Sequence, residues 1–399
     1  MKAHLFQLSE LGEIVSGSTP KTGVTEFWNG DIPWVTPADL TSHDGIWFQG
    51  KPKGITQAGY DSCSTRMLPR GSILFSSRAP IGHCAVAPYP LCTNQGFKSL
   101  VTNDRLDPIY GYFALRFVTP SIIARGRGAT FAEVSTEIME SIQIPVPSLP
   151  QQQQIARQLE EADRLRRTRR YALALSDTFL PAAFLQLFGD SSYRNVRLEE
   201  LAADEKNSVV NGPFGSDLLT RELTRSGVPV IYIRDISSGR YERTSTSFVT
   251  TAKAAELEFC NAKPGDVLVA KVGDPPGIAV IYPTTEMDGV VTQDVIRIRP
   301  NTKLVSPAFL QAFLNSSLAH REMAKIMVQG TRQRFSLGQF KEISVPLPAL
   351  NLQNEFALLM TRAERLRSVQ RESLRQAEHL FQTLLHRAFG GVSDRAVLR

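Results

Sequence analysis

A repeat of about 200 residues constrains this chain more than any other feature of its sequence. Residues 162–166 read Ala-Asp-Arg-Leu-Arg, and adding 201 to each number gives Ala-Glu-Arg-Leu-Arg at 363–367. The same offset relates residues 142–147 to residues 343–348 without an insertion. Such a period is too long for a solenoid repeat. It predicts a globular domain followed by a helix, present twice in one polypeptide.

The two segments that precede the repeated helices predict mostly β, irregular domains. Short apolar runs at 32–35, 72–75 and 85–87 are separated by Pro and Gly, which is typical of strands joined by turns. A 3.6-residue period predicts a helix over 108–120. The second copy follows the same plan with looser spacing, which indicates that insertions and deletions have accumulated in its loops.

The segment from Leu149 to about Leu180 predicts a long helix. It holds no Gly and one Pro, at its start, and at about 30 residues it would be roughly 45 Å long. We expect Pro181 to kink or end this helix and Gly189 to close the segment. An apolar stripe is predicted to pack the helices together or to dock a partner; its members are Ile155, Leu159, Ala162 and Leu165, repeated as Phe356, Met360, Ala363 and Leu366.

This reading divides the chain into residues 1–147, 148–189, 190–348 and 349–399, as domain, helix, domain, and helix with a C-terminal tail. The two helical segments keep their length whereas the domains differ in their loops. Helices of fixed length suit a spacer, and domains with variable loops suit two readers that recognise different targets.

Composition excludes several classes of protein. A net charge of +6 and a pI near 9.2 permit a polyanionic partner without requiring one. The N-terminal residues do not form a signal peptide, and no window approaches 18 uncharged apolar residues, so no membrane span is expected. Free thiols in a reducing cytosol and no metal site are expected, because no CxxC spacing links Cys63, Cys84, Cys92 and Cys260.

The sequence contains no complete copy of several familiar catalytic motifs. Residues 273–277 contain the Asp-Pro-Pro of amino-methyltransferases, but Gly277 stands where that motif places an aromatic residue to stack on a flipped base. A tight turn is therefore the favoured interpretation. The chain contains no phosphate-binding GxxxxGK[ST] loop, no HExxH and no Gly-x-Ser-x-Gly elbow, and its six histidines are scattered.

Polar and basic loops at matching places in the two domains are the candidates for DNA contact. Gly beside small polar residues permits close approach to phosphates, and amide side chains can bind adenine in a major groove. Singly, each candidate is also explained by a capped turn. The candidates are Ser18, Thr19, Lys21, Arg78, Thr93, Asn94, Gln95, Arg125, Arg127 and Thr130 in the first domain, and Asn211, Phe214, Ser216, Arg234, Lys271, Thr292, Gln293, Arg332 and Arg334 in the second.

An arginine-rich run in the first helix has two interpretations. Five arginines lie within seven residues, at 164, 166, 167, 169 and 170. They sweep more than half of the helix circumference, and acidic neighbours lie at 160, 161 and 163, which favours a solvated helix surface. The alternative is contact with DNA phosphates or an acidic partner, and it is supported by the recurrence of three of them at 365, 367 and 371.

The whole layout resembles the specificity subunit of type I restriction–modification systems. The residues that carry the resemblance are Ile14–Pro20 with Ile32–Trp34, Thr93–Gln95, Gly128–Phe131 and the junction Ile144–Ile155. The resemblance implies an α+β chain in which two pseudo-repeated mixed α/β target-recognition domains are separated by two long antiparallel helices, a coiled-coil spacer. Each domain would read one half of an asymmetric bipartite target in double-stranded DNA.

The resemblance also implies partners for this chain. The helices would set the spacer and dock two methyltransferase subunits, and ATP-dependent restriction subunits would join where restriction occurs. The chain itself would be a non-catalytic, cytoplasmic protein that binds no cofactor, with S-adenosylmethionine on the partner subunits.

Three alternatives stay open at this point. The chain could be the DNA-targeting subunit of another multi-subunit defence or modification complex. It could be a stand-alone methyltransferase or nuclease with cryptic motifs. It could also be a coiled-coil scaffold without a role in DNA binding.

Overall fold

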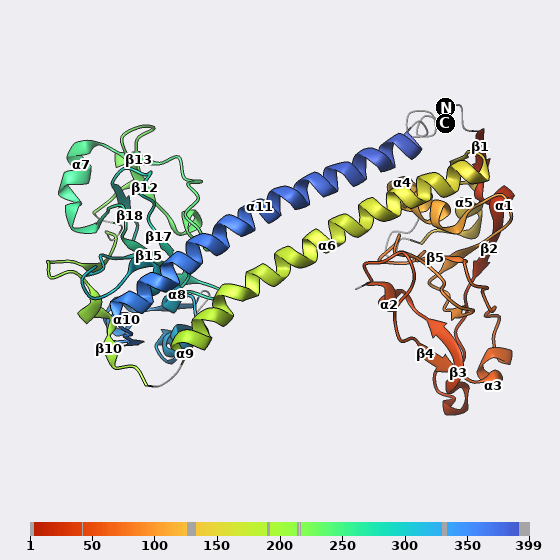
Figure 1. Cartoon of the computed structure of the whole chain (residues 1–399), viewed down its shortest axis with the longest axis horizontal. Coiled ribbons are helices and arrows are strands. Elements are labelled where there is room, and N and C mark those ends of the chain that lie inside the picture. The colour runs from red at the N-terminus through yellow and green to blue at the C-terminus, as the bar shows by residue number, and fades with distance from the viewer. Residues whose placement is uncertain are drawn as a thin grey trace. The chain divides into compact units, whose positions relative to one another are not determined.

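The chain folds into two compact units, each of which takes residues from both long helices. The computed structural model describes residues 4–41, 43–125, 133–189, 192–213, 215, 217–328 and 333–390. One unit comprises residues 1–171 and 371–399, and the other comprises residues 172–370 (Figure 1). Each unit therefore holds one globular domain, the first half of the helix that follows this domain, and the second half of the other helix.

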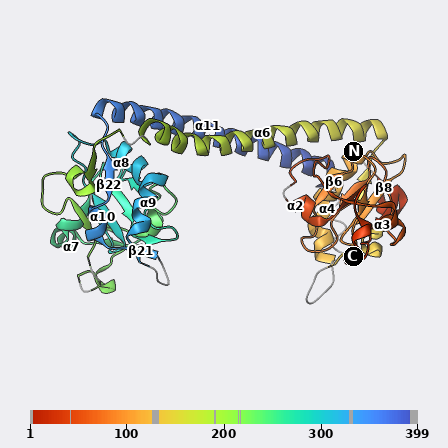
Figure 2. The same cartoon turned by 90° about the horizontal axis from the view of Figure 1, so that it is seen from below.

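In the first unit, short strands and helices build one mixed domain. Its sheets have the strand orders β2-β8-β5-β6, β4-β3-β7 and β1-β9. The pairing of β3 with β7 is parallel, and the other pairings between these strands are antiparallel. Helix α4 packs against β5 and β6 (Figure 2). The elements are β1 His4–Gln7, α1 Leu8–Leu11, β2 Gly12–Ser16, η1 Thr25–Phe27, β3 Trp28–Val35, α2 Pro37–Thr41, β4 Lys53–Ile55, α3 Gln57–Asp61, β5 Ile73–Phe75, β6 Cys84–Val86, β7 Cys92–Thr93, β8 Lys98–Thr102, α4 Pro108–Arg125, α5 Thr136–Ser141 and β9 Gln143–Val146.

The second unit repeats this topology with one strand added to these sheets. The orders β11-β19-β15-β17 and β10-β22 match two sheets of the first unit. The order β13-β12-β18-β14 matches β4-β3-β7 with β14 added at its edge, and the pairing of β12 with β18 is again parallel. A further sheet, β16-β21-β20, has no counterpart among the described residues of the first unit. The elements are β10 Asn195–Arg197, η2 Leu198–Leu201, β11 Val209–Asn211, η3 Thr220–Glu222, β12 Val228–Ile231, η4 Ile233–Asp235, β13 Phe248–Val249, α7 Thr251–Glu256, η5 Glu258–Cys260, β14 Asn261–Ala262, β15 Val267–Ala270, β16 Val272–Gly273, β17 Ala279–Ile281, β18 Gly289–Val291, β19 Val295–Ile298, α8 Pro307–Leu314, α9 Ser317–Lys325, β20 Met327–Val328, β21 Gln333–Phe335, α10 Leu337–Lys341 and β22 Ser344–Pro346.

The long helices are α6, Leu149–Phe188, and α11, Leu350–Phe389, of 40 residues each. At 1.5 Å per residue each measures roughly 60 Å, longer than the sequence predicted. Both units show that they run antiparallel. In the first unit Arg166 stacks on Phe381 and Arg170 pairs with Glu378, and in the second unit Phe184 lies against Phe356, so numbers rise along one helix as they fall along the other.

Proline ends neither of the helices in which it was expected to act as a boundary. Helix α4 continues past Pro120, and α6 continues past Pro181. The residues beyond each proline explain why, because Ile122 in α4 and Phe184 in α6 are almost fully buried. Burial of these side chains offsets the backbone hydrogen bond that proline cannot donate. The end of α6 is as predicted: it stops at Phe188, where the N–H of Gly189 donates to the Leu185 carbonyl over 2.8 Å.

Helix α6 also contains an 18-residue window that is long and apolar enough to cross a membrane by length and composition alone. The sequence analysis expected no window of 18 uncharged apolar residues, and this window does contain a charged residue, Asp177. Phe184 and Phe188, in the second half of α6, are buried beside Phe309 and Phe356 inside the second unit. The exposed large apolar residues of this half include Tyr171, Leu175, Phe179, Leu185 and Leu187. Asp177, in the same half, forms an ion pair with Arg367.

Candidate nucleic-acid interface

The loop that follows β2 is held in place at Gly17, a position that has no room for a side chain. The N–H of Ser18 donates to the Thr93 carbonyl over 3.0 Å. A Cβ on Gly17 would lie 2.1 Å from the Asn94 carbonyl oxygen, so only glycine permits this approach of two backbones. The indole N–H of Trp34 donates to the Ser18 carbonyl over 2.9 Å and secures the loop from its other side.

The turn after β7 joins this loop and presents one exposed amide. The Thr19 hydroxyl donates to the side-chain oxygen of Gln95, which is exposed. The side-chain oxygen of Asn94 accepts from the Gly96 N–H over 2.9 Å and so closes the turn. The structure thus brings together Ser18, Thr19, Asn94 and Gln95. Thr93 lies here too, but its side chain is buried, so it supports the loops and is no candidate for DNA contact.

A third loop, between β5 and β6, completes the cluster in the first unit. The N–H of Ser77 donates to the Gly96 carbonyl over 2.8 Å. The next residue, Arg78, is exposed and pairs with Glu133 over 3.1 Å. Lys98 was missed by the sequence analysis because it lies within the strand β8. It donates to the Ser16 hydroxyl over 2.9 Å and, with Arg125 at the end of α4, lines a groove of about 880 Å³.

The second unit builds the same junction from matching loops. A Cβ on Gly212 would lie 1.9 Å from the Val291 carbonyl oxygen, and the Gly212 N–H donates to the Thr292 carbonyl over 3.2 Å. Asn211 is buried and donates its amide to the Gly212 carbonyl, so it shapes the loop rather than reaching outward. The Thr292 hydroxyl donates to the Ile231 carbonyl over 3.0 Å and is likewise a support. Gln293, the next residue, is exposed.

Cationic side chains border this second junction. The N–H of Lys271 donates to the Asp294 carbonyl over 2.9 Å, which ties the loop after β15 to the turn after β18. Partial burial lowers the pKa of the Lys271 ammonium, against the opposing effect of Asp294, and the charge of Arg334 lowers it further. Arg334 is exposed on β21, opposite Val272. Arg234 lies elsewhere, stacked on Tyr232 and bonded to the Ser245 hydroxyl.

Five candidate residues lie outside the described residues and have no place in this description: Arg127, Thr130, Phe214, Ser216 and Arg332. Lys21 is exposed in the loop after β2, and its carbonyl accepts the indole N–H of Trp28 over 3.4 Å. The two tryptophans that secure this loop pack edge to face with ring centroids 5.1 Å apart. The sequence analysis placed Trp34 in an apolar run and in the family resemblance, and it did not consider Trp28.

The helix stripe predicted from the sequence is buried or partly buried in its first turns and exposed at its last position. Leu159, Ala162, Phe356 and Ala363 are buried, and Ile155 and Met360 are partly buried against their domains. Leu165 and Leu366 are 40% and 64% exposed, so they do not pack within the described chain. One residue further on, Arg166 is buried and Arg367 is partly buried, since a spacing of 4-3-3 falls behind the 3.6-residue turn of the helix.

The arginine run in α6 is mainly a packing feature. Arg166 is buried, lies 4.4 Å over the ring of Phe381 and binds Asp163. Arg167 binds Asp163 over 2.8 Å and donates to the Asp44 carbonyl, so it joins the helix to the domain. The interpretation as a wholly solvated surface is therefore wrong for these two residues. Arg164 and Arg169 are exposed, as the interpretation of the run as a solvated surface requires.

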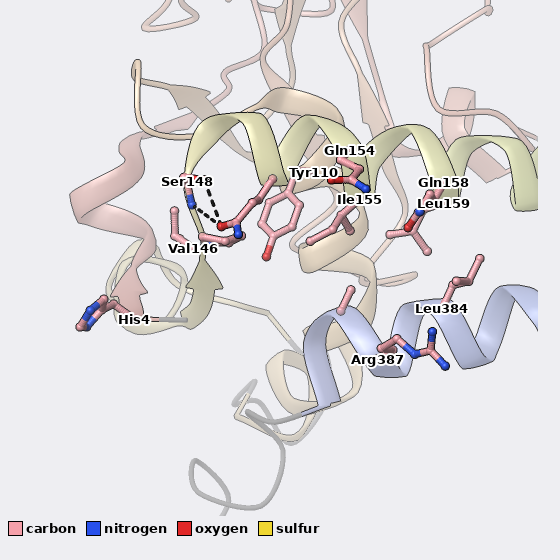
Figure 3. Close-up of a pocket in the computed structure, with 13 residues that line it drawn as sticks. His4, Tyr110, Val146, Ser148, Gln154, Ile155, Gln158, Leu159, Leu384 and Arg387 are labelled. Carbon is pink, nitrogen blue, oxygen red and sulfur yellow. Dashed lines mark hydrogen bonds between the residues drawn. The ribbon is translucent and has the colours of Figure 1, made fainter. Parts of the chain in front are cut away.

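A groove of about 720 Å³ lies at the start of α6, beside the last turns of α11 (Figure 3). Its floor is apolar, with Tyr110, Ile155 and Leu384, and its rim carries Gln154, Gln158 and Arg387 (Figure 3). Burial of Tyr110 raises the pKa of its hydroxyl, which donates to the Pro145 carbonyl over 2.7 Å. The groove is thus a property of the helix junction and not of the polar loops.

The features that could have suggested chemistry have structural roles. The Asp-Pro-Pro segment connects β16 to β17, and it closes where the Gly277 N–H donates to the Ala270 carbonyl over 2.7 Å. In the described part of the chain, no group of three or more His, Cys, Asp or Glu side chains could hold a metal ion. The four cysteines are free, and burial raises the pKa of Cys84 and Cys260 to about 12 and of Cys92 to about 11.

The class of this chain is defined by two domains that share a topology and by two long antiparallel helices. In each domain a glycine loop and a third loop both contact one turn. The chain belongs to the family of the type I restriction modification DNA specificity domain, whose model matches residues 2–173 and 222–378, well over half of the chain. The two matched stretches follow the internal repeat.

Individual type I specificity subunits are similar in sequence to this chain. The specificity subunit of the type I restriction enzyme MjaIX of Methanocaldococcus jannaschii is 39% identical over 161 residues, which are 40% of this chain and 37% of that protein. That of the Escherichia coli enzyme EcoR124I/EcoR124II is 28% identical over 165 residues, 40% of each chain. The chain thus matches well under two thirds of the length of these relatives.

Two solved structures share the fold over nearly the whole chain. One belongs to a structural study of complex assembly and conformational transition of the type I R-M system. It is 18% identical to this chain with a TM-score of 0.61, and the match covers 97% of this chain and 98% of that chain. The other is the type I restriction–modification S subunit of M. genitalium, 16% identical with a TM-score of 0.58, covering 97% and 96%. At these identities the likeness establishes the α+β fold and nothing finer.

Proposed function

We propose that this chain is the DNA sequence-recognition subunit of a type I restriction–modification complex, with each recognition domain reading one half of an asymmetric bipartite target. One observation carries the proposal. In both domains the loop after the second strand meets a turn at a glycine that tolerates no side chain, a third loop is hydrogen-bonded to the same turn, and the junction presents an exposed amide and nearby cations. A duplicated reader of this kind needs two half-sites.

The side chains at these junctions suit contact with double-stranded DNA. Gln95 and Gln293 are exposed amides at the turns after β7 and β18, where each could bind an adenine edge. Arg78, Lys271 and Arg334 supply positive charge for phosphates. Arg125, Lys21, Ser18, Thr19 and Asn94 are secondary candidates, while buried Thr93 and Asn211 and the hydroxyl of Thr292 act as supports. Because the two sets differ, the half-sites differ.

The helices α6 and α11 serve as the spacer. A continuous helix is stiff over its length, so its residue count fixes how far apart two attached readers can act. Readers that meet one face of B-DNA must be a whole number of turns apart, about 34–36 Å for one turn. The spacer would thus determine how many base pairs lie unread between the half-sites. Two tethered readers also gain affinity through effective concentration.

Catalysis is assigned to partner subunits in this proposal. The chain would bind no cofactor and carry no catalytic residue, and S-adenosylmethionine would be bound by two methyltransferase subunits docked on the helices. Exposed apolar residues such as Leu165, Leu366 and Val369 suit such docking. ATP-dependent restriction subunits would complete a restriction complex. All of these partners act on cytoplasmic DNA.

The test changes the length of the spacer and maps the methylated motif. Deleting four residues (about one helical turn) within Arg157–Ala172 should alter the number of unread base pairs or abolish methylation. Single-molecule sequencing for N6-methyladenine, in cells with the gene, without it and with the shortened gene, measures this. The length-preserving change Arg169→Ala, at an exposed position of the same helix, is the control. An unchanged motif in the shortened variant contradicts the proposal.

A further inference from the structure

Two buried glutamines, Gln152 and Gln353, occupy the same place in the two copies of the repeat. Each lies in the first turn of its long helix, and neither side chain is more than 1% exposed. Their numbers differ by the repeat offset, as do those of Pro147 and Pro348. A buried polar side chain is costly unless its hydrogen bonds are satisfied. Both glutamines satisfy theirs, and they do so in the same way.

The three hydrogen bonds of Gln152 tie α6 to the loop before α4. Its side-chain oxygen accepts from the Asp107 N–H over 2.9 Å. Its amide donates to the Arg105 carbonyl over 2.8 Å and to the Pro147 carbonyl over 2.9 Å. One side chain thus connects the end of β9, the start of the long helix and the residue before α4.

Gln353 repeats this arrangement in the second unit. Its side-chain oxygen accepts from the Ser306 N–H over 2.8 Å, and its amide donates to the Leu304 carbonyl over 3.1 Å and the Pro348 carbonyl over 2.9 Å. One partner, the proline carbonyl before the helix, is the same in both copies. The other two partners are main-chain groups of different residues, Arg105 and Asp107 in the first copy and Leu304 and Ser306 in the second.

The partners of the glutamines lead directly to the reading loops. Asp107 caps α4, because its carboxylate accepts from the N–H groups of Ile109 and Tyr110. Helix α4 packs against β5, whose end leads into the loop of Arg78. In the second unit Ser306 is the N-cap residue of α8, without a side-chain capping bond. Helix α8 packs against β15, and β15 leads into the loop of Lys271.

We infer that Gln152 and Gln353 are positioning residues that lock each spacer helix to the core helix of its recognition domain, and so set the angle at which the reading loops meet the DNA. The inference rests on the proposed function. Neither glutamine would touch DNA. Loss of the hydrogen bonds of one glutamine would let that domain change its angle to the helix. The domain could then bind its half-site when the spacer is one base pair longer or shorter.

The experiment uses the full chain assembled with its methyltransferase subunits and a set of DNA duplexes. The duplexes carry both half-sites separated by the native spacer or by one base pair more or fewer. Gln152→Met and Gln353→Met keep the side-chain volume and remove the polar atoms. The control is Gln153→Met, an exposed neighbour in the same turn. The ratio of methylation at altered spacers to methylation at the native spacer is measured.

We expect this ratio to rise about tenfold, a factor that corresponds to 1.4 kcal/mol, in both buried variants and to stay at the wild-type value in Gln153→Met. A merely structural role would lower the overall rate and leave the ratio unchanged, and that result overturns the inference. If a Met variant does not fold, Gln152→Glu supplies the same measurement, because it keeps the acceptor for Asp107 and loses both donated bonds. A wild-type complex that methylates none of the duplexes refutes the proposed function instead.

Discussion

The five-residue motif that defines the repeat lies in equivalent helices but in different surroundings. In α6 the side chain of Asp163 is 1% exposed and is bound by Arg166, Arg167 and, at 3.9 Å, Arg116 of α4. In α11 the side chain of Glu364 is 44% exposed and is bound by Arg367 and by Arg240 of the second domain. Each carboxylate joins its own helix to its own domain. The first does so inside the core and the second does so at the surface.

In a second pair of equivalent residues, Ile155 and Phe356, the residue of the second copy is the more buried one. Ile155 is partly buried and lines the groove at the start of α6. Phe356 stands at the same place in α11, is 2% exposed, and packs with Phe184, Phe188 and Phe309 at ring distances of 5.0–5.6 Å within the group. Both helices pack apolar residues against their domains. The first adds a buried group of ion pairs to this packing, and the second adds a group of aromatic rings.

The largest expected effect tests the aromatic side of this comparison. Phe356→Ala should lower the free energy of unfolding by about 4 kcal/mol, because it opens a cavity among four rings. Ile155→Ala should cost about 2 kcal/mol, since part of that side chain already faces the groove. Urea unfolding monitored by circular dichroism measures both. Ile155→Phe is the reciprocal change, and it should cost no more than about 1 kcal/mol because the groove has room. Equal losses for the two alanine variants would contradict the comparison.

The charged side of the comparison predicts a smaller difference. Asp163→Asn should cost about 3 kcal/mol, because it leaves the buried guanidinium of Arg166 without its counter-ion. Glu364→Gln should cost less than about 1 kcal/mol, as expected for an exposed ion pair. Thermal and urea unfolding of the two variants, in low and in 0.5 M salt, provide the measurement, and only the Glu364 pair should respond to salt. A loss for Glu364→Gln as large as that for Asp163→Asn would show that the two environments are energetically equivalent.

The smallest effect on stability concerns the exposed leucines of the repeat. Leu366→Ala and Leu165→Ala should each change the free energy of unfolding by less than about 0.5 kcal/mol, because both side chains face outward. If the proposed methyltransferase partner docks on these helices, both changes should weaken its binding, measured by titration calorimetry with the purified partner. The buried Ala363 provides the contrast, since enlarging it to Leu should destabilise the chain itself. A stability loss of about 2 kcal/mol for Leu366→Ala would instead place this leucine in a contact within the chain.

Much of the architecture could be predicted from the sequence, because a repeat is visible without knowledge of contacts. The helix stripe through Leu159 and Ala162 was found because a helix must turn its apolar residues to one side. The stripe failed at Leu165, where the buried position belongs to Arg166, whose long side chain is satisfied by Asp163 and by the ring of Phe381. No periodicity of apolar residues can identify a buried arginine.

The candidate interface was predicted less completely. Loops rich in Gly and small polar residues were recognised, and the structure brings Ser18, Thr19, Asn94 and Gln95 together. Thr93 and Asn211 were assigned to DNA contact and are buried supports, because a polar side chain in a loop can turn inward to bond the main chain as readily as outward. Gly17 contacts Asn94, and Gly212 contacts Val291. Because these segments are distant in sequence, no local sequence pattern predicts the two contacts.

The sequence by itself determined that the chain is a duplicated domain-and-helix unit with long helices, since repetition and periodicity are properties of the order of residues. Tertiary structure alone decided which member of each equivalent pair is buried. Burial depends on what the rest of the domain places over a helix, and in this protein those covering loops are the parts that differ between the two copies.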